Sequence, residues 1–271
     1  MMDSFEAKNI VAGYGNGPNI VLDVSFKLDR GEFVSILGRN GCGKTTLLKS
    51  VLGLLPVRQG EVNCNNKELL RLNEADRAKE VAYVPQAHRP PFPFLVEDVV
   101  RMGRTPHLSR LSVEKAEDVE IAHECMVQVG IDALAKRPYT HLSGGQQQLV
   151  IIARALAQRA NFIIMDEPTS SLDYGNQYRV LAQIRKLCDE INIGALMVTH
   201  DPAHCFYAAD RVILMDEGKL LKSGRSEDVI DSSVLSELYD FPVTVDNALI
   251  DGNLEMICVP KRFINRIGGR K

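Results

Sequence analysis

The sequence predicts an α/β fold built around a mainly parallel β-sheet. A compact apolar run, Phe33–Leu37, leads into a glycine-rich turn and then into a helical segment. From Phe162 to Met215, strand-like and helix-like segments alternate along the chain. Such alternation is typical of parallel strands that are joined by crossover helices.

The N-terminal part of the chain predicts strands before the first helix. Strand-like runs such as Val24–Leu28 are interrupted by the Gly/Pro/Asn-rich segment Gly13–Asn19. Phe33–Leu37 is apolar enough for a buried strand. Thr45–Gly53 predicts a helix that ends at a glycine, and Val81–Val84 predicts another short strand.

The middle of the chain, from Val96 to Ala157, predicts mostly helices. Apolar residues recur there at three- and four-residue spacing, as at Val119, Ala122, Met126 and Val129. From about Ser223 the signals weaken, and we expect a small appendage of helix and short strands over 223–271. The alternating elements before it are Phe162–Met165, Val180–Leu187, Ala195–Val198, Ala203–Ala209 and Arg211–Met215.

Composition and charge restrict the class of protein. The 271 residues include 32 Lys and Arg against 35 Asp and Glu, a formal net charge of −3, so the bulk charge does not indicate a nucleic-acid partner. No apolar run approaches the ~20 residues that span a bilayer. The six cysteines have no CxxC spacing and no secretory signal opens the chain, so we expect reduced thiols in the cytosol.

The segment GRNGCGKT at residues 38–45 fits the phosphate-binding pattern GxxxxGK[ST] between a predicted strand and a predicted helix. Lys44 would reach the β- and γ-phosphates of ATP, and the Thr45 hydroxyl would ligate Mg²⁺. Only the backbone of Cys42 should matter, so its alkylation should block ATP binding by bulk, and ATP should protect it. The residues assigned to the nucleotide are Gly38, Asn40, Gly41, Cys42, Gly43, Lys44, Thr45 and Thr46.

A second motif supplies acidic groups. Phe162–Met165 is an apolar strand that is followed directly by Asp166 and Glu167. Asp166 can hold Mg²⁺ through water and so complete the metal site that begins at Thr45. Glu167 can accept a proton from the attacking water. Two adjacent acids could merely be an exposed strand end, but together with the phosphate loop they predict a hydrolytic site.

A third motif, LSGGQ at residues 142–146, precedes the helical run Gln147–Ala157. Ser143 suits a helix N-cap, but a bare cap does not require two glycines and a glutamine. At this point the sequence resembles the ABC ATPase family, whose signature is LSGGQ, over about residues 4–225. The resemblance implies a P-loop NTPase core with a mainly parallel sheet, an antiparallel β subdomain and an inserted α-helical subdomain. It also implies a nucleotide-binding domain over 1–222, with the helical subdomain at about 88–160.

The resemblance assigns further residues to the site. Tyr14 matches the aromatic residue that stacks on adenine, a contact that suits a flat ring. Gln86 matches the Q-loop, which contacts Mg²⁺ and water, and residues 171–173 match the D-loop at the dimer interface. His200 matches the switch histidine that contacts the γ-phosphate. Catalysis thus falls to Glu167, His200 and Gln86, and metal binding to Thr45, Gln86 and Asp166.

In this family the signature faces ATP that is bound by a second subunit. A hydroxyl and backbone amides at a helix start are good donors to phosphate. The γ-phosphate contacts exist only before hydrolysis, so ATP should hold a homodimer closed and hydrolysis should loosen it. The residues that would act across this interface are Ser143, Gly144, Gly145, Gln146 and Asp173.

The function that the motor drives is open between two classes. DNA-maintenance members carry a long coiled-coil insertion, but Ser143 follows Lys44 by only 99 residues. An ATPase that acts on a cytosolic assembly scaffold, of the Fe–S cluster assembly type, remains possible. A transporter subunit is favoured because the stiff segment 88–94 lies where transporters receive a coupling helix. Residues 99–107 and 166–177 are similar to importers of iron-siderophore, haem, cobalamin and related chelates or oxyanions.

The importer interpretation implies a set of partners. These are a second copy of the chain, a dimer of an integral-membrane permease and, indirectly, an extracytoplasmic substrate-binding protein, with no nucleic acid. The chain would lie peripherally on the cytoplasmic face of the inner membrane.

Overall fold

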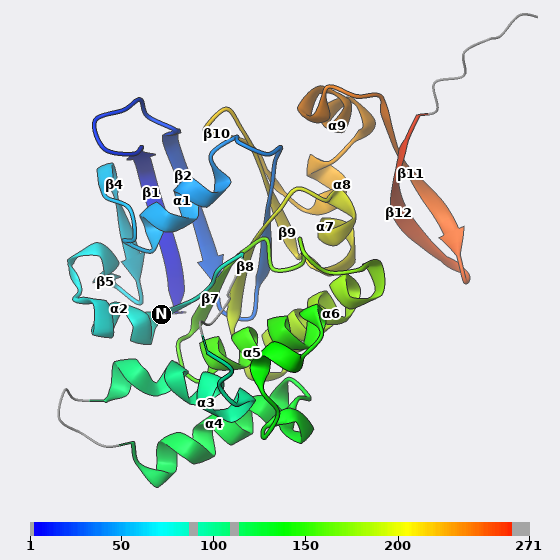
Figure 1. Cartoon of the computed structure of the whole chain (residues 1–271). Helices are drawn as coiled ribbons and strands as arrows, with labels where there is room; N and C mark the ends of the chain where they lie inside the picture. The colour runs from blue at the N-terminus through cyan, green and yellow to red at the C-terminus, as the bar shows by residue number, and fades with distance from the viewer. Residues whose placement is uncertain (1–2, 87–91, 109–113, 262–271) are drawn as a thin grey trace, which may run out of the picture.

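The structure, a computed structural model, describes residues 3–86, 92–108 and 114–261. Its centre is a six-stranded sheet with the order β10-β9-β3-β8-β7-β6 (Figure 1). The neighbours from β9 to β6 are parallel, whereas β10 pairs antiparallel with β9. The strands are β3 (Phe33–Leu37), β6 (Val81–Val84), β7 (Phe162–Asp166), β8 (Gly194–Thr199), β9 (Arg211–Asp216) and β10 (Lys219–Gly224).

The central strands β3, β7 and β8 are buried along their whole length. Alternate residues of β7 therefore pack into two different cores. Ile163 and Met165 join the core that includes the helices α5 (Gly144–Leu156) and α6 (Tyr174–Ile191), while Phe162 and Ile164 join the core around α1 (Lys44–Val51). Because both faces are covered, these strands are continuous apolar runs rather than alternating ones.

An antiparallel sheet with the order β2-β1-β4-β5 forms the second layer. Along β2, the buried residues Val24, Phe26 and Leu28 alternate with exposed ones, as expected for a sheet with one face in water. Helix α1 contacts this sheet and β7 of the main sheet. The strands are β1 (Ser4–Ala12), β2 (Val21–Asp29), β4 (Val57–Cys64) and β5 (Lys67–Glu68).

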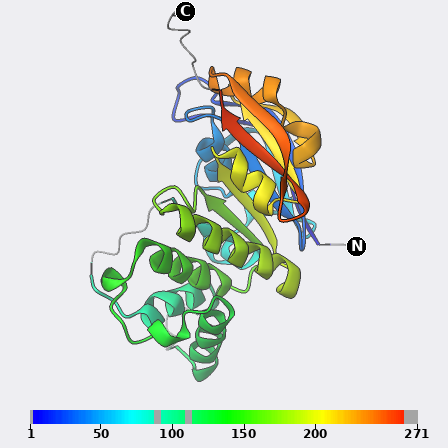
Figure 2. The same ribbon diagram turned by 90° about the vertical axis from the view of Figure 1, so that its right-hand side faces the viewer.

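A helical subdomain lies below the two sheets in the views of Figures 1 and 2. It is formed by α3 (Val96–Arg101), α4 (Ala116–Gln128) and the N-terminal part of α5, with α3 in contact with both of the others. The remaining helices of the main body are α2 (Glu74–Glu80) and α7 (Pro202–Ala208). Short 3₁₀ turns occupy Leu69–Arg71, Met102–His107, Asp132–Leu134 and Tyr139–His141.

Helix α4 corrects one detail of the predicted apolar face. Ala122, Met126 and Val129 are buried, but Val119 is exposed. The buried position one residue earlier belongs to Asp118, which accepts a 2.9 Å hydrogen bond from Arg104 Nε. An α-helix turns about 100° per residue, and this places Asp118 nearer than Val119 to the centre of the inward face. A hydrogen-bonded ion pair therefore occupies the buried position that the apolar spacing predicted for valine.

The C-terminal appendage follows β10. It contains the short helix α8 (Ser226–Val229), α9 (Ser232–Tyr239) and a hairpin of β11 (Val243–Ile250) and β12 (Asn253–Pro260), whose strands are longer than the expected short ones. Asp251 and Gly252 turn the hairpin with φ of 51° and 85°, which suits an Asp-Gly turn. The hairpin extends from the body beside α7 (Figures 1 and 2).

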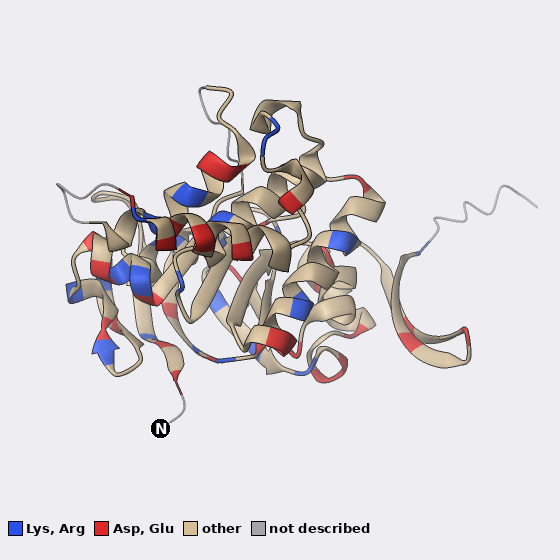
Figure 3. Cartoon of the chain, turned by 90° about the horizontal axis from the view of Figure 1, so that it is seen from below, with Lys and Arg blue, Asp and Glu red and all other residues tan. Residues whose placement is uncertain are grey.

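The predicted fold class is confirmed, with a mainly parallel sheet, an antiparallel β subdomain and a helical insertion. In the part of the chain that the structure describes, no helix combines the length and apolarity that crossing a membrane requires. Lys and Arg are interspersed with Asp and Glu along the elements drawn in Figure 3. Of the segment 88–94, on which the coupling-helix expectation rested, residues 88–91 lie outside the described residues.

Candidate functional site

Four neighbouring strands deliver the predicted site to one edge of the main sheet. Because β3, β8, β7 and β6 run in parallel, their carboxyl ends meet at the same edge. The phosphate loop follows β3, and Gln86 follows β6. Asp166 ends β7 beside Glu167, and His200 follows β8. Ligands of open α/β sheets bind at this kind of edge.

The phosphate loop has the backbone that its glycines permit. Gly41 and Gly43 have φ of 82° and 107°, in the left-handed region that favours glycine. A Cβ on Gly38 would lie 2.3 Å from the carbonyl oxygen of Met215, so no larger residue fits. The buried Lys44 donates hydrogen bonds from Nζ to the carbonyl oxygens of Gly38 (2.7 Å) and Arg39 (2.9 Å). The ammonium group of Lys44 is thus held by carbonyl oxygens of the phosphate loop itself.

Thr45 and Asp166 form a pair of oxygen donors. Thr45 Oγ1 donates a 3.0 Å hydrogen bond to Oδ1 of Asp166, although 121 residues separate them in the chain. Asp166 is only 2% exposed, and burial raises the pKa of its carboxyl, with a further rise from Glu167. A hydroxyl beside one carboxylate fits Mg²⁺, which uses few protein ligands together with phosphate and water.

Glu167 is the centre of a polar cluster. Its Oε2 accepts a 3.2 Å hydrogen bond from Nε2 of Gln86, and its Oε1 lies 3.3 Å from Nδ1 of His200. Glu167 has a φ of 47°, while its N–H donates to the carbonyl oxygen of Val198 at 3.2 Å. A non-glycine residue in this region is strained, and such strain concentrates at functional sites.

Gln86 and Glu167 of this cluster border a cavity of about 380 Å³. Its lining contains most of the predicted phosphate loop together with Gln86 and Glu167. Sequence reasoning missed Ile20, whose only sequence signal is that it precedes a strand. Ser170 was also missed, although its hydroxyl lies 3.5 Å from Nε2 of Gln86. The lining residues are Ile20, Asn40, Gly41, Gly43, Lys44, Thr45, Thr46, Gln86 and Glu167.

The signature lies at the start of α5 and does not line this cavity. Ser143 Oγ accepts a 3.4 Å hydrogen bond from the Gln146 N–H, and Gln146 Oε1 accepts a 3.1 Å bond from the Ser143 N–H. A Cβ on Gly145 would approach Asn176 to 2.9 Å, and one on Gly144 would approach Leu172. Close packing against these neighbours is therefore a second reason for a glycine at each of the two positions. The signature is held against the D-loop of its own chain, not against its own phosphate loop.

Residues 21–170 match the ABC transporter family. The chain belongs to that family. It is an ABC-type ATPase, and ATP is the nucleotide that this membership implies.

Relatives of this ABC ATPase match over most of its length. An uncharacterized ABC transporter ATP-binding protein of Haemophilus influenzae is 40% identical, covering 86% of this chain and 88% of the relative. The hemin import ATP-binding protein HmuV of Burkholderia thailandensis is 35% identical, covering 84% and 90%. A solved structure described as a metal-chelate type ABC transporter in an inward-facing conformation has a TM-score of 0.85 at 30% identity, covering 97% and 98%.

Outside the signature, six predicted residues of this ABC ATPase do not line the cavity: Tyr14, Gly38, Cys42, Asp166, Asp173 and His200. Tyr14 is exposed in the β1–β2 loop. Arg58 donates a hydrogen bond to the Gly15 carbonyl oxygen in this loop. Cys42 is buried inside the loop, and burial raises the pKa of its thiol. Asp173 caps α6 by accepting the Asn176 N–H at 3.0 Å, and the hydrogen bonds from Asn176 lower its pKa.

Proposed function

We propose that this ABC ATPase is the motor subunit of an importer for a metal chelate such as haem. The observation that carries the proposal is the cluster of Glu167, Gln86 and His200 at the cavity of the phosphate loop. ATP hydrolysis at this cluster would be common to the whole family and does not identify a cargo. The cargo in the names of relatives supports import as the process and a metal chelate as the substrate. Hemin is the cargo in the name of one relative, and the solved structure is of metal-chelate type.

The described side chains can carry out hydrolysis in a simple order. Lys44 would exchange the carbonyl oxygens of Gly38 and Arg39 for the β- and γ-phosphates. Thr45 and Asp166, with the amide oxygen of Gln86, would hold Mg²⁺, which neutralises charge on the phosphates when bound. Glu167 accepts the proton of the attacking water, and His200 contacts the γ-phosphate.

The complete site would contain two copies of the chain. Ser143 and the amides of Gly144 and Gly145 begin α5, where backbone N–H groups and the helix dipole favour phosphate. They do not line the cavity of their own chain, so they would complete the site of a second copy. Closure of that homodimer would exclude water and position the attacking molecule, as phosphoryl transfer requires.

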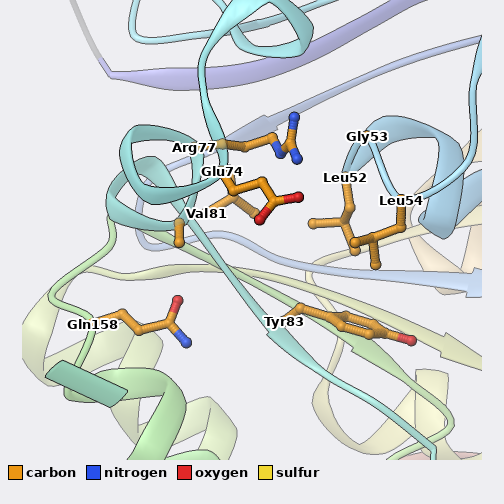
Figure 4. A pocket seen from close by; sticks show the side chains of 9 residues that line it. Leu52, Gly53, Leu54, Glu74, Arg77, Val81, Tyr83 and Gln158 are labelled. Atoms are coloured by element: carbon orange, nitrogen blue, oxygen red, sulfur yellow. The ribbon is translucent and has the colours of Figure 1, made fainter. Parts of the chain in front are cut away.

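A groove suited to a permease lies on another side of the core. The pocket in Figure 4 has a volume of about 480 Å³ and lies between the end of α1, α2, β6 and the segment after α5. Leu52, Leu54, Val81 and Tyr83 contribute apolar surface, and Glu74 and Arg77 contribute charge. A pocket whose lining combines apolar and charged side chains suits the end of an amphipathic helix. We propose that a cytoplasmic helix of the permease binds here, which would hold the ATPase on the cytoplasmic face of the membrane.

Co-purification tests the proposal directly. The tagged ATPase is recovered from detergent-solubilised membranes of its host, and its partners are identified by mass spectrometry. A stoichiometric permease with many transmembrane helices is the expected result, and its binding protein would then identify the chelate. If the protein is instead recovered only in the soluble fraction, with a cytosolic scaffold protein as its partner, the ATPase activity would stand but the importer function would be wrong.

The groove is tested in the same experiment with a matched pair of variants. Leu54→Asp places a charge in the groove at a side chain that is already 58% exposed, so the fold should tolerate it. Leu221→Asp makes the same change on β10 at a similar exposure of 54%. Loss of the permease with the first variant alone is expected. Equal recovery with both variants would place the docking surface elsewhere.

A further inference from the structure

His204 on α7 connects two loops of the site through hydrogen bonds. Its side chain is buried, with the residue only 4% exposed, and Nδ1 lies 3.1 Å from Thr199 Oγ1. Thr199 Oγ1 already accepts the Asp201 N–H at 3.0 Å. The threonine hydroxyl keeps its proton free to donate to Nδ1, and the hydroxyl of Thr169 lies 3.5 Å from the same nitrogen. Thr199 and Asp201 are the two residues that flank His200.

The other ring nitrogen continues the connection to the D-loop. Oε1 of Gln177 lies 3.2 Å from Nε2 and can only accept, so the proton of the neutral ring is on Nε2 and Nδ1 is the acceptor. The amide nitrogen of Gln177 in turn donates to the Leu172 carbonyl oxygen at 3.0 Å. The chain of bonds thus runs from Asp201 through Thr199, His204 and Gln177 to Leu172.

The charged and titratable groups around His204 leave its ring neutral at pH 7. Asp201 Oδ2 lies 3.6 Å from Nε2 and favours the protonated ring, while His200 disfavours it. From α6, the Tyr178 ring packs edge-on at 5.9 Å. Burial is the largest effect and lowers the pKa of His204 below its usual value. Only the neutral ring can accept from Thr199 and donate to Gln177 together.

We propose that His204 and Gln177 are positioning residues that fix the turn carrying His200 relative to the D-loop at Leu172. Neither residue would touch the nucleotide. The proposal rests on the proposed role of His200 at the γ-phosphate, and it adds that the position of His200 depends on the D-loop of the same chain. Because the D-loop is expected at the dimer interface, dimer closure and His200 would then move together.

Two substitutions separate the two hydrogen bonds. His204→Asn can present Oδ1 near the position of Nδ1, and so keep the bond from Thr199 only. His204→Gln can present its amide nitrogen near the position of Nε2, and so keep the bond to Gln177 only. We expect each variant to lower kcat by about tenfold, because the connection requires both bonds. ATP affinity, measured with a fluorescent nucleotide, should stay within about twofold, because the phosphate loop is untouched.

Cys205→Ala is the matched control for general damage to α7. Cys205 is the next residue along the helix and is completely buried; its thiol makes a long 4.0 Å contact with the Asp201 carbonyl oxygen but takes no part in the hydrogen bonds of the Thr199, His204 and Gln177 side chains. The Tm of Cys205→Ala should fall because packing is lost, while its kcat should be retained. If the two His204 variants lose kcat only in proportion to Tm, as this control does, the role of His204 is structural and the proposal is wrong.

The pH profile of kcat provides a readout that a structural role would not move. Gln177→Glu places a carboxylate against Nε2 and should raise the pKa of His204. The protonated ring cannot accept from Thr199, so the acid limb of the profile should move to higher pH. Adding His204→Asn to Gln177→Glu should remove this shift. An unchanged acid limb in Gln177→Glu would overturn the proposal.

His200→Ala distinguishes failure here from failure of the proposed function. If His200→Ala retains full ATPase activity, the role of His200 itself is wrong. If His200→Ala is inactive while His204→Asn and His204→Gln keep kcat within about twofold of the unmodified protein, only the positioning role is wrong.

Discussion

Oε1 of Glu167 lies 3.3 Å from Nδ1 of His200, across the edge of the sheet where β7 and β8 end. The two residues follow different strands, and Glu167, whose φ is 47°, lines the cavity. The two residues that we propose as proton acceptor and γ-phosphate contact therefore lie side by side. In the proposed mechanism, closure of the homodimer would add the signature of a second copy to this pair.

Glu167→Gln should bind ATP and accumulate as a closed dimer. Glutamine keeps the shape of the side chain but cannot take the proton of water, so the γ-phosphate contacts persist. Size-exclusion chromatography with light scattering in Mg-ATP should give a dimer mass. The same variant in Mg-ADP should remain monomeric, and a monomer at saturating Mg-ATP would contradict the sandwich.

Asp166→Asn should abolish ATPase activity and yet stabilise the nucleotide-free fold. Burial raises the pKa of this carboxyl, so its stabilising protonated form is present at low pH and is lost as the pH rises through the raised pKa. At neutral pH the charged carboxylate therefore lowers the free energy of unfolding. Removing the charge should add about 1 kcal/mol, or about 2–4 °C in Tm.

The Asp166→Asn measurement is thermal unfolding in EDTA at several pH values. The gain over the unmodified protein should shrink as the pH falls toward the ordinary aspartate value of about 3.9. A lower Tm for the variant at pH 7 would show that the Thr45 hydrogen bond outweighs the cost of the charge.

Alkylation of Cys42 should block ATP binding slowly. The thiol is buried and burial raises its pKa, so little thiolate is available, whereas Cys258 is only half-buried. Mass spectrometry of N-ethylmaleimide adducts should show that loss of ATP binding follows modification of Cys42 and that ATP slows it. Cys42→Ala should keep ATP binding after the same treatment. Unchanged binding by protein modified at Cys42 would sink the prediction.

Tyr239→Phe should reveal a contribution of the C-terminal appendage to the site. The Tyr239 hydroxyl on α9 donates a 2.8 Å hydrogen bond to the carbonyl oxygen of His200. Burial raises the pKa of this hydroxyl, so it stays protonated and remains a donor. Loss of one such bond costs about 1 kcal/mol, and we expect kcat to fall by about two- to fivefold.

Steady-state ATPase assays and Tm check the Tyr239→Phe prediction. Tyr207→Phe removes the hydroxyl of an exposed tyrosine on α7 and is expected to leave both quantities unchanged. An unchanged kcat in Tyr239→Phe would show that this hydrogen bond from the appendage does not contribute to catalysis.

Local patterns alone predicted every strand of the main sheet except β10, but not the strands β4 and β5 or the helix α2. The strands Phe33–Leu37 and Val81–Val84 have the same bounds in sequence and structure, and most of the other predicted elements differ by one to three residues at their ends. The main exception is α6, which begins at Tyr174 rather than near Val180. Its first turn is polar and carries no apolar period, so only the cap at Asp173 marks its start.

The sequence by itself determined the family, the phosphate loop and the order of the motifs, because each of these is a local pattern of residue types at fixed spacing. The tertiary structure alone decided which distant residues meet. Thr45 and Asp166 touch because β3 and β7 flank β8 and end at one edge of the sheet. The connection from Thr199 through His204 and Gln177 to Leu172 depends on how α6 and α7 pack, and no spacing encodes it. Short-range preferences fix the elements, whereas burial and hydrogen-bond satisfaction in the folded chain select the contacts between them.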